Sequence, residues 1–177
     1  MNELTAESFQ IEDREALIDE IMTKYGQEIL QLVYSYVKNK EIAEDLTQDI
    51  FVKCYKSLST YKGKSKLRTW LWRIAINHCK DYLKSWYNKN VLITENEYVY
   101  SGKQNESVEQ TVIQQDDDQQ LAAVVMSLPI NYREVIYLFY FEELPIKEIA
   151  AVLQVKENTV KTRLRRAKEL LKERLEE

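Results

Sequence analysis

Residues 156–174 could bind a nucleic-acid duplex. This segment holds eight basic side chains against three acidic ones. Arg and Lys can donate hydrogen bonds to the O6 and N7 atoms of guanine, and Thr or Asn can reach base edges or phosphates. Spaced as on a helix, the side chains of these types share one face, and they are Asn158, Thr159, Lys161, Thr162, Arg165 and Arg166. The spacing predicts a helix face that reads base pairs.

A second basic segment, residues 61–90, holds eight basic side chains against one acidic one and contains several aromatic residues. Aromatic rings among cations suit unstacked single-stranded bases, where stacking contributes about 1–3 kcal/mol per base. A neutral amide on such a face could read a base edge. The candidate residues are Tyr61, Lys62, Lys64, Lys66, Trp70, Arg73, Asn77 and Lys80. The alternative makes the tryptophans core and the lysines surface, and for Trp86 we favour that alternative.

The rest of the chain is acidic, and the whole chain has a net charge of −4. Residues 1–60 hold six basic and twelve acidic side chains, and residues 91–130 hold one and seven. This pattern is typical of a protein that contacts nucleic acid at two places and repels it elsewhere.

The elements that must position these residues are helices. Only three Gly and two Pro occur, and apolar residues recur at helical spacing, so we predict an all-α fold. An N-terminal bundle is expected from helices 17–37, 41–58 and 67–87. The inward residues predicted for it are Ile18, Met22, Tyr25, Ile29, Leu32, Val33, Tyr36, Ile42, Leu46, Ile50, Cys54, Leu58, Leu71, Ile74, Ala75, His78, Tyr82 and Trp86. The polar, acidic residues 88–115 are predicted to form a flexible linker.

Four further helices are expected at residues 121–128, 129–141, 146–153 and 156–175. Residues 145–171 have the layout of a helix-turn-helix, with a short helix, a tight turn and a longer helix. Ala150 is small where the two helices approach closely, and the buried stripe of the second helix is Val160, Leu164, Ala167 and Leu171. The alternative is a basic, solvated last helix on an ordinary bundle.

The helix over residues 41–58 has a polar outward face. Its members are Asp45, Gln48, Asp49, Val52 and Lys56. By itself, this pattern indicates no more than a solvated face of an amphipathic helix.

Together these segments carry a family resemblance. EDLTQDIFVKCY, the basic loop and TWLWRIAINHCKDYL resemble region two of bacterial sigma factors, and the segment from LPINYREVIYLFYF to VKTRLRRAKELL resembles region four. An acidic linker with no intervening domain is similar to the layout of the extracytoplasmic-function group. The resemblance covers roughly residues 20–87 and 119–175, and we expect a region-two domain at 1–87, a linker at 88–115 and a region-four domain at 116–177.

The resemblance implies a promoter-recognition subunit of RNA polymerase. The outward face of residues 45–56 would bind the β′ clamp, and the polymerase's β flap would be a second contact. Tyr61 to Leu67 with Asn77 would capture a flipped base of the −10 element, and Lys161, Thr162, Arg165 and Arg166 would read the −35 element. An anti-sigma factor, of a kind that can be membrane-bound, is the expected regulator. Two departures from the family pattern are Gln154, where Gly is common, and Asn158, where a small residue is common.

No residue pattern indicates catalysis, a metal site or a cofactor. His78 is the only histidine and falls on an apolar helix face, and Cys54 and Cys79 form no metal-ligand motif. With no signal peptide and no apolar run of about 20 residues, we expect a cytoplasmic protein without direct membrane insertion. Two rivals are a helix-turn-helix regulator with an N-terminal sensing or dimerisation bundle and a protein-binding helical adaptor. The first leaves residues 61–86 unexplained, and the second explains neither basic segment.

Overall fold

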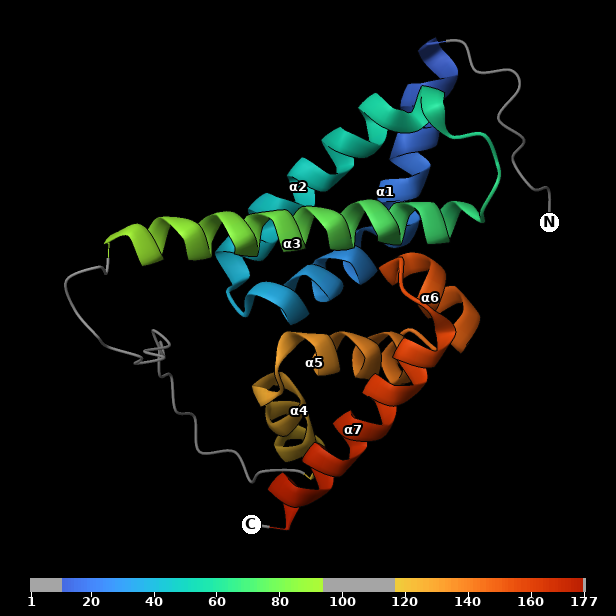
Figure 1. The fold of residues 1–177 in the computed structure, drawn as a ribbon. Helices are drawn as coiled ribbons and strands as arrows, with labels where there is room; N and C mark the ends of the chain where they lie inside the picture. The colour runs from blue at the N-terminus through green and yellow to red at the C-terminus, as the bar shows by residue number, and fades with distance from the viewer. Residues whose placement is uncertain (1–10, 94–116, 177) are drawn as a thin grey trace.

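The computed structural model describes residues 11–93 and 117–176, and within these ranges it contains helices and no strand (Figure 1). This confirms the all-α prediction for the described residues. The elements are α1 (Ile11–Val37), α2 (Lys40–Ser57), the 3₁₀ helix η1 (Leu58–Thr60), α3 (Leu67–Ile93), α4 (Asp117–Ser127), α5 (Ile130–Ile136), the π-helical segment η2 (Tyr137–Phe141), α6 (Ile146–Leu153) and α7 (Glu157–Leu175). None of these helices is both long and apolar enough to cross a bilayer.

Helices α1, α2 and α3 form the N-terminal bundle. Asn39 sets the start of α2, because its side chain accepts a hydrogen bond from the backbone N–H of Ile42 at 2.9 Å and so caps the helix. Most of the predicted inward positions are buried or half-buried, and Ile29, Leu32, Ile50 and Leu71 are among the fully buried ones.

Two predicted core residues are exposed instead. Met22 is 47% exposed, since Leu17 and Ile21 fill the neighbouring inward positions of α1. Trp86 is 54% exposed because α3 extends beyond its neighbours α1 and α2, so no helix covers its last turns (Figure 1). Trp72 is the tryptophan that the bundle buries completely, against the edge of the Tyr25 ring.

The length of α3 shows that the predicted linker began too early in the sequence. Helix α3 continues to Ile93, so residues 88–93 are helical and do not belong to a flexible segment. The sequence over residues 88–93 carries no apolar stripe that would predict a helix. These residues extend a helix that is already formed, so they do not bear the free-energy cost of helix nucleation. The remainder of the predicted linker, from residue 94 to 115, lies outside the described residues, and the domain boundaries remain predictions.

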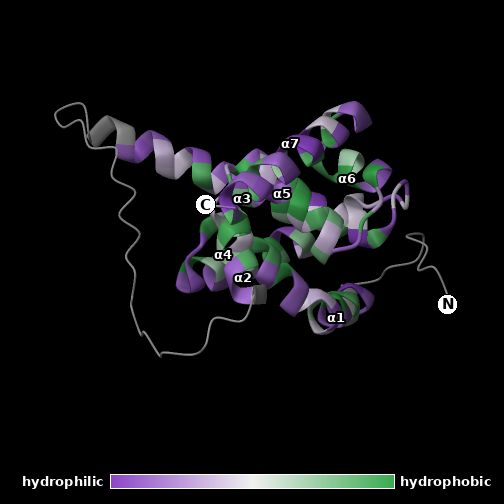
Figure 2. Cartoon of the chain, turned by 90° about the horizontal axis from the view of Figure 1, so that it is seen from below, coloured by the Kyte–Doolittle hydropathy of each residue, from purple (hydrophilic) through white to green (hydrophobic). Residues whose placement is uncertain are grey.

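Helices α4, α5, η2, α6 and α7 form the C-terminal bundle. Pro129 and Pro145 directly precede α5 and α6, at positions where a missing backbone N–H leaves no helical hydrogen bond unmade. Hydrophobic residues gather on α5 and α6 inside the molecule, whereas α7 is largely hydrophilic (Figure 2). On α7 the predicted stripe is confirmed at Val160, Leu164 and Ala167, which are buried.

The turn between α6 and α7 uses a left-handed residue. Gln154 has φ 57° and ψ 42°, and its backbone N–H donates to the Ala150 carbonyl to cap α6. The Val155 N–H reaches the same carbonyl at 3.1 Å. The left-handed conformation costs an L-residue about 1–2 kcal/mol, so the helix-turn-helix carries strain at this position.

We predict that Gln154→Gly stabilises the protein. Gly removes that strain but loses about 0.5–1 kcal/mol more backbone entropy on folding, which leaves a net gain of about 0.5–1 kcal/mol in the free energy of unfolding. Denaturant unfolding measures this. The matched control is Ala151→Gly, in α6 one helical turn before the cap, which should destabilise by about 1 kcal/mol. Equal destabilisation by both changes would contradict the account of the turn.

Candidate nucleic-acid interface

The predicted duplex-reading residues lie on the outer face of α7. Asn158, Lys161, Thr162, Arg165 and Arg166 are exposed, and Thr159 is half-buried. The opposite face of α7 packs into the C-terminal bundle. The division of α7 into a buried apolar face and an exposed polar face was therefore predicted correctly. The outer face of α7 therefore presents its cations to solvent.

Two of these side chains have local partners. The Thr162 hydroxyl donates to the Asn158 carbonyl at 2.9 Å, and Arg166 lies 3.0 Å from Glu169 and 3.7 Å from Glu173. Such exposed ion pairs contribute little energy, so a phosphate or a guanine can replace the carboxylates. Arg165 and Lys161 have no ion-pair partner among the described residues.

The predicted single-strand face begins in the loop before α3. Within it, the Tyr61 and Trp70 rings lie 5.2 Å apart with their planes tilted by 46°. The Tyr61 hydroxyl donates to the Ser65 carbonyl at 2.5 Å, which closes the loop on itself. Lys62 and Lys64 project into solvent. The structure therefore presents an ordered loop with an aromatic pair and free cations beside it.

Asn77 is exposed on α3, between Arg73 and Lys80 along the helix. Its amide makes no hydrogen bond to any other described residue, so both its donor and its acceptor are available. That Asn77 contacts a base stays a prediction.

The other three cations of this face, Lys66, Arg73 and Lys80, contact the C-terminal bundle. The Lys66 ammonium lies 2.8 Å from Glu148, and the Arg73 guanidinium donates to the Ala151 carbonyl at 3.2 Å.

The third of these contacts joins Lys80 to Glu134, the most buried carboxylate of the described residues. The Lys80 ammonium lies 3.0 Å from it, the Tyr36 hydroxyl donates to it at 2.6 Å, and Arg163 of α7 lies at 3.3 Å. The side chain of Glu134 is 1% exposed. Burial, followed by the adjacent carboxylate, raises the pKa of Tyr36 well above its ordinary value, so Tyr36 stays a neutral donor.

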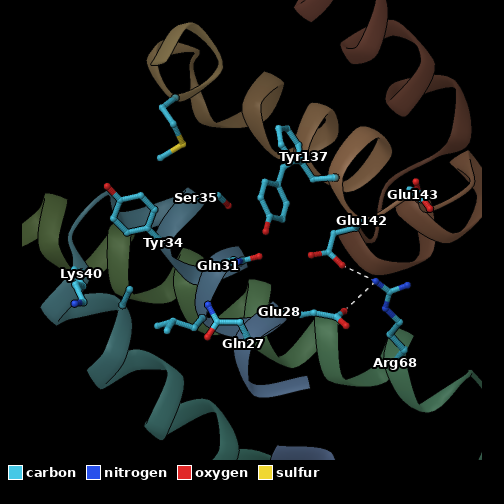
Figure 3. Close-up of a pocket in the computed structure, with 14 residues that line it drawn as sticks. Gln27, Glu28, Gln31, Tyr34, Ser35, Lys40, Arg68, Tyr137, Glu142 and Glu143 are labelled. Carbon is cyan, nitrogen blue, oxygen red and sulfur yellow. Dashed lines mark hydrogen bonds and ion pairs between the residues drawn. The ribbon is translucent and has the colours of Figure 1, made fainter. Parts of the chain in front are cut away.

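A further cation, Arg68, joins the two bundles beside a pocket. Its guanidinium lies 2.6 Å from Glu142 and 3.2 Å from Glu28, and these contacts line a pocket of about 920 Å³ between α1 and η2 (Figure 3). Burial raises the pKa of Glu142, and Arg68 opposes that shift. The guanidinium also lies 4.8 Å from the centre of the Trp72 ring.

The outward face of α2 is open to solvent along its length. All its predicted members are exposed, and they are Asp45, Gln48, Asp49, Val52 and Lys56. Asp49 lies 3.7 Å from the half-buried His78, whose pKa is lowered by burial and by Lys53. His78 therefore stays neutral and packs at the edge of the bundle, and no group of three metal-ligating side chains occurs among the described residues.

Comparison with known proteins identifies both halves of the chain. The family described as Sigma-70 region 2 matches residues 21–87, and Sigma-70, region 4 matches residues 118–171. The ECF RNA polymerase sigma factor SigW of Bacillus subtilis is 32% identical over 170 residues, which cover 92% of this chain and 90% of SigW. SigM of the same organism is 34% identical, with 88% and 93% covered. This chain belongs to the ECF sigma factors of RNA polymerase.

The fold of this sigma factor is shared with solved structures. The sigma factor RpoE of Bartonella quintana, solved in complex with the anti-sigma factor NepR, superimposes with a TM-score of 0.70 at 20% identity, covering 89% of this chain and 96% of that one. CnrH, solved with the cytosolic domain of CnrY, gives 0.65 at 21% identity, covering 92% and 89%. These likenesses show the two-domain helical fold.

Sequence reasoning missed the contacts between the bundles. Tyr36 was predicted only as a core residue, and Arg68 and Glu134 were not singled out. All three lie where the two halves of this sigma factor meet. Tyr36 and Glu134 are 98 residues apart in sequence, and no helical period relates them. The one available signal is Glu134 itself, a charged residue directly before the apolar run of residues 135–141.

We predict that Tyr36→Phe lowers the free energy of unfolding of the sigma factor by about 1–3 kcal/mol. The change removes one donor from a buried carboxylate, and Lys80 and Arg163 remain as its partners. Tyr34→Phe is the matched control, because Tyr34 is 44% exposed on the same helix and should change stability by less than about 0.5 kcal/mol. Denaturant unfolding of both variants gives the comparison, and equal effects would show that the Tyr36 hydroxyl has no structural role.

Proposed function

We propose that this sigma factor directs core RNA polymerase to promoters by reading two DNA elements with its two basic faces. The observation that carries the proposal is the separation of these faces on two bundles that each match a sigma region. The outer face of α7 would read the −35 duplex, and the loop before α3 with Asn77 would hold the −10 single strand.

For the −35 element, the support is the geometry of the helix-turn-helix. Helix α7 buries its apolar stripe and leaves Lys161, Arg165 and Arg166 exposed on a face that fits a major groove. Each bidentate base contact contributes about 1–3 kcal/mol of discrimination.

For the −10 element, the support is the combination of an aromatic pair, free cations and a free amide. Capture of an unstacked base by the loop and Asn77 would offset the few kcal/mol that unstacking costs, so opening needs no ATP. The sigma factor therefore acts as a binding subunit and catalyses no reaction of its own.

Binding to core polymerase is supported by the outward face of α2, which is exposed to solvent. Each DNA-binding face by itself would bind weakly and with strong salt dependence. Once core polymerase holds the sigma factor through its clamp and flap, the second DNA contact becomes intramolecular, and a promoter with both elements is preferred.

We also propose an anti-sigma factor as a regulatory partner, because similar folds have been solved with such proteins. The site of action is the cytoplasm, where core polymerase and promoter DNA are.

The experiment combines binding to core polymerase with run-off transcription from a promoter library. We expect 1:1 binding and transcripts from a restricted set of promoters that share two elements. Duplex binding without any effect on core would favour a helix-turn-helix regulator, and binding to neither would favour a helical adaptor.

We predict that Asp45→Arg together with Gln48→Ala lowers the affinity for core polymerase about tenfold or more, as charge reversal at a docking face does. Circular dichroism should stay unchanged, because both side chains are exposed. The matched control is Asp19→Arg with Gln27→Ala, which makes the same changes at exposed positions of α1. Equal core affinity of the two double variants would show that the α2 face is only solvated surface.

We predict that Asn77→Ala forms open promoter complexes roughly tenfold to a hundredfold less well, because an extruded base loses its hydrogen-bonding partner at about 1–3 kcal/mol. Stability should be equal or slightly higher, since Ala has the better helix propensity by up to about 0.7 kcal/mol. Permanganate footprinting of −10 thymines measures opening, and a pre-melted template should recover only part of the loss.

Asn88→Ala is the control for this prediction, because Asn88 is exposed on the same helix and outside the candidate set. Open-complex formation by Asn77→Ala at the level of Asn88→Ala would rule out base reading by Asn77.

A further inference from the structure

Three cations from distant parts of the chain lie around the end of α4. The Arg133 guanidinium donates to two backbone carbonyls of residues 126–128 at 2.9 and 3.2 Å, and the Arg174 guanidinium donates to the hydroxyl of the serine between them. Arg133 also donates at 3.3 Å to the carbonyl of Tyr36, two residues before Lys38. The end of α1, the end of α4 and the last turn of α7 thus bring Lys38, Arg133 and Arg174 to one place.

None of these three cations forms an ion pair with a carboxylate of the described residues. The hydrogen bonds of the two arginines go to carbonyls and a hydroxyl. Glu134 acts on Arg133 electrostatically, but its oxygens already pair with other donors. Burial, followed by Arg133 and Arg174, lowers the pKa of Lys38. The positive charge at the end of α4 therefore has no counter-charge in contact with it within the described chain.

The carbonyls at helix C-termini attract cations, and this accounts for part of the cluster. Arg133 is buried and is held by the helix ends that it bonds. Lys38 is exposed and Arg174 is half-buried, so an external group can reach both of them. Like charges repel, and the protein therefore loses free energy by gathering three of them unless an anion joins the cluster.

A groove beside Arg174 extends the cluster along α4. Its volume of about 440 Å³ lies within the ~300–1,000 Å³ range of small-molecule pockets. The lining combines a guanidinium, a hydroxyl, two amides and two apolar side chains, and contains no carboxylate. The lining residues are Gln119, Gln120, Ala123, Val124, Ser127 and Arg174.

The charge and the groove together fit a phosphate monoester. Such a group carries about −1.5 to −2 charges at pH 7 and three strong acceptor oxygens, whereas a phosphodiester carries a single charge. Arginine can donate two parallel hydrogen bonds to a phosphate, and lysine adds a point charge. The amides and apolar side chains of the groove can then contact the organic part of the same molecule.

We propose that Lys38, Arg174 and the groove beside them bind a phosphate monoester of a small organic molecule, with the phosphate on the two cations and the organic part in the groove. Arg133 adds its charge from inside the protein. Arg174 lies about 12 Å beyond Arg166, the last residue of the proposed −35 face, at ~1.5 Å per residue. The site is therefore separate from the proposed DNA contacts, and its test needs neither polymerase nor promoter.

The ligand is tested by thermal unfolding of the full chain with adenosine monophosphate as the probe. A ligand that binds only the folded state stabilises it, so millimolar probe should raise the midpoint by about 2–4 °C. Adenosine lacks the phosphate and dimethyl phosphate is a diester, so each should shift the midpoint by less than about 1 °C. Inorganic phosphate should shift it less than adenosine monophosphate does. An equal shift with any of these three compounds would overturn the assignment.

The site is tested with Lys38→Met and with Arg174→Gln, each of which should lose most of the shift caused by adenosine monophosphate. Arg133 is not varied, because three backbone carbonyls depend on it. The matched control is Lys172→Met, which removes the same charge from an exposed position in the last turn of α7 and should keep the shift. Equal shifts in Lys38→Met and Lys172→Met would show that the nucleotide binds elsewhere or non-specifically, and would overturn the proposal.

Unfolding without ligand separates the cluster from an ordinary helix-end cation. In chloride buffer, Lys38→Met should raise the midpoint by about 1–2 °C, because it relieves repulsion within the cluster. Met keeps an L side chain at this left-handed position, where φ is 55°, so backbone strain is unchanged. Lys172→Met should lower the midpoint slightly, as loss of a cation at a helix C-terminus does. A similar fall in Lys38→Met would mean that Lys38 only stabilises the end of α1, and would contradict an anion site.

Discussion

The buried carboxylate of Glu134 is the interaction on which the packing of the two bundles depends. A lone ionised carboxylate in a protein interior costs several kcal/mol, so it must find cations and donors. Arg163 comes from its own bundle, while Tyr36 and Lys80 come from the other. Neither bundle alone gives Glu134 its full set of partners, and the two must therefore meet at α1, α3 and α5.

This requirement explains the distribution of charge along the chain. The basic segment at residues 61–90 and the acidic side chains of residues 134–148 neutralise one another across the boundary. The proposed function requires part of the same basic segment to contact nucleic acid. Lys62 and Lys64 have no such contact and remain exposed.

The helices and the outward faces could be predicted from sequence because both depend on local periodicity. Helix α6 was predicted at its observed bounds, and the exposed sides of α2 and α7 followed from the apolar residues on their other sides. Trp86 and Met22 were assigned wrongly, since periodicity shows which face is apolar but not where a neighbouring helix ends. The ion pairs between the bundles could not be predicted, because Lys66 and Glu148 are 82 residues apart and their contact arises from tertiary packing alone.

The central claim is that carboxylates of the C-terminal bundle hold the basic side of α3 and the residue before it. Zero-length carbodiimide cross-linking tests this most directly, because it joins a lysine to a carboxylate only when the two are in contact. The Lys66–Glu148 pair, at 2.8 Å in the structure, is the diagnostic link. The account predicts a Lys66–Glu148 cross-linked peptide in the free sigma factor. Absence of the link in the free protein would contradict it.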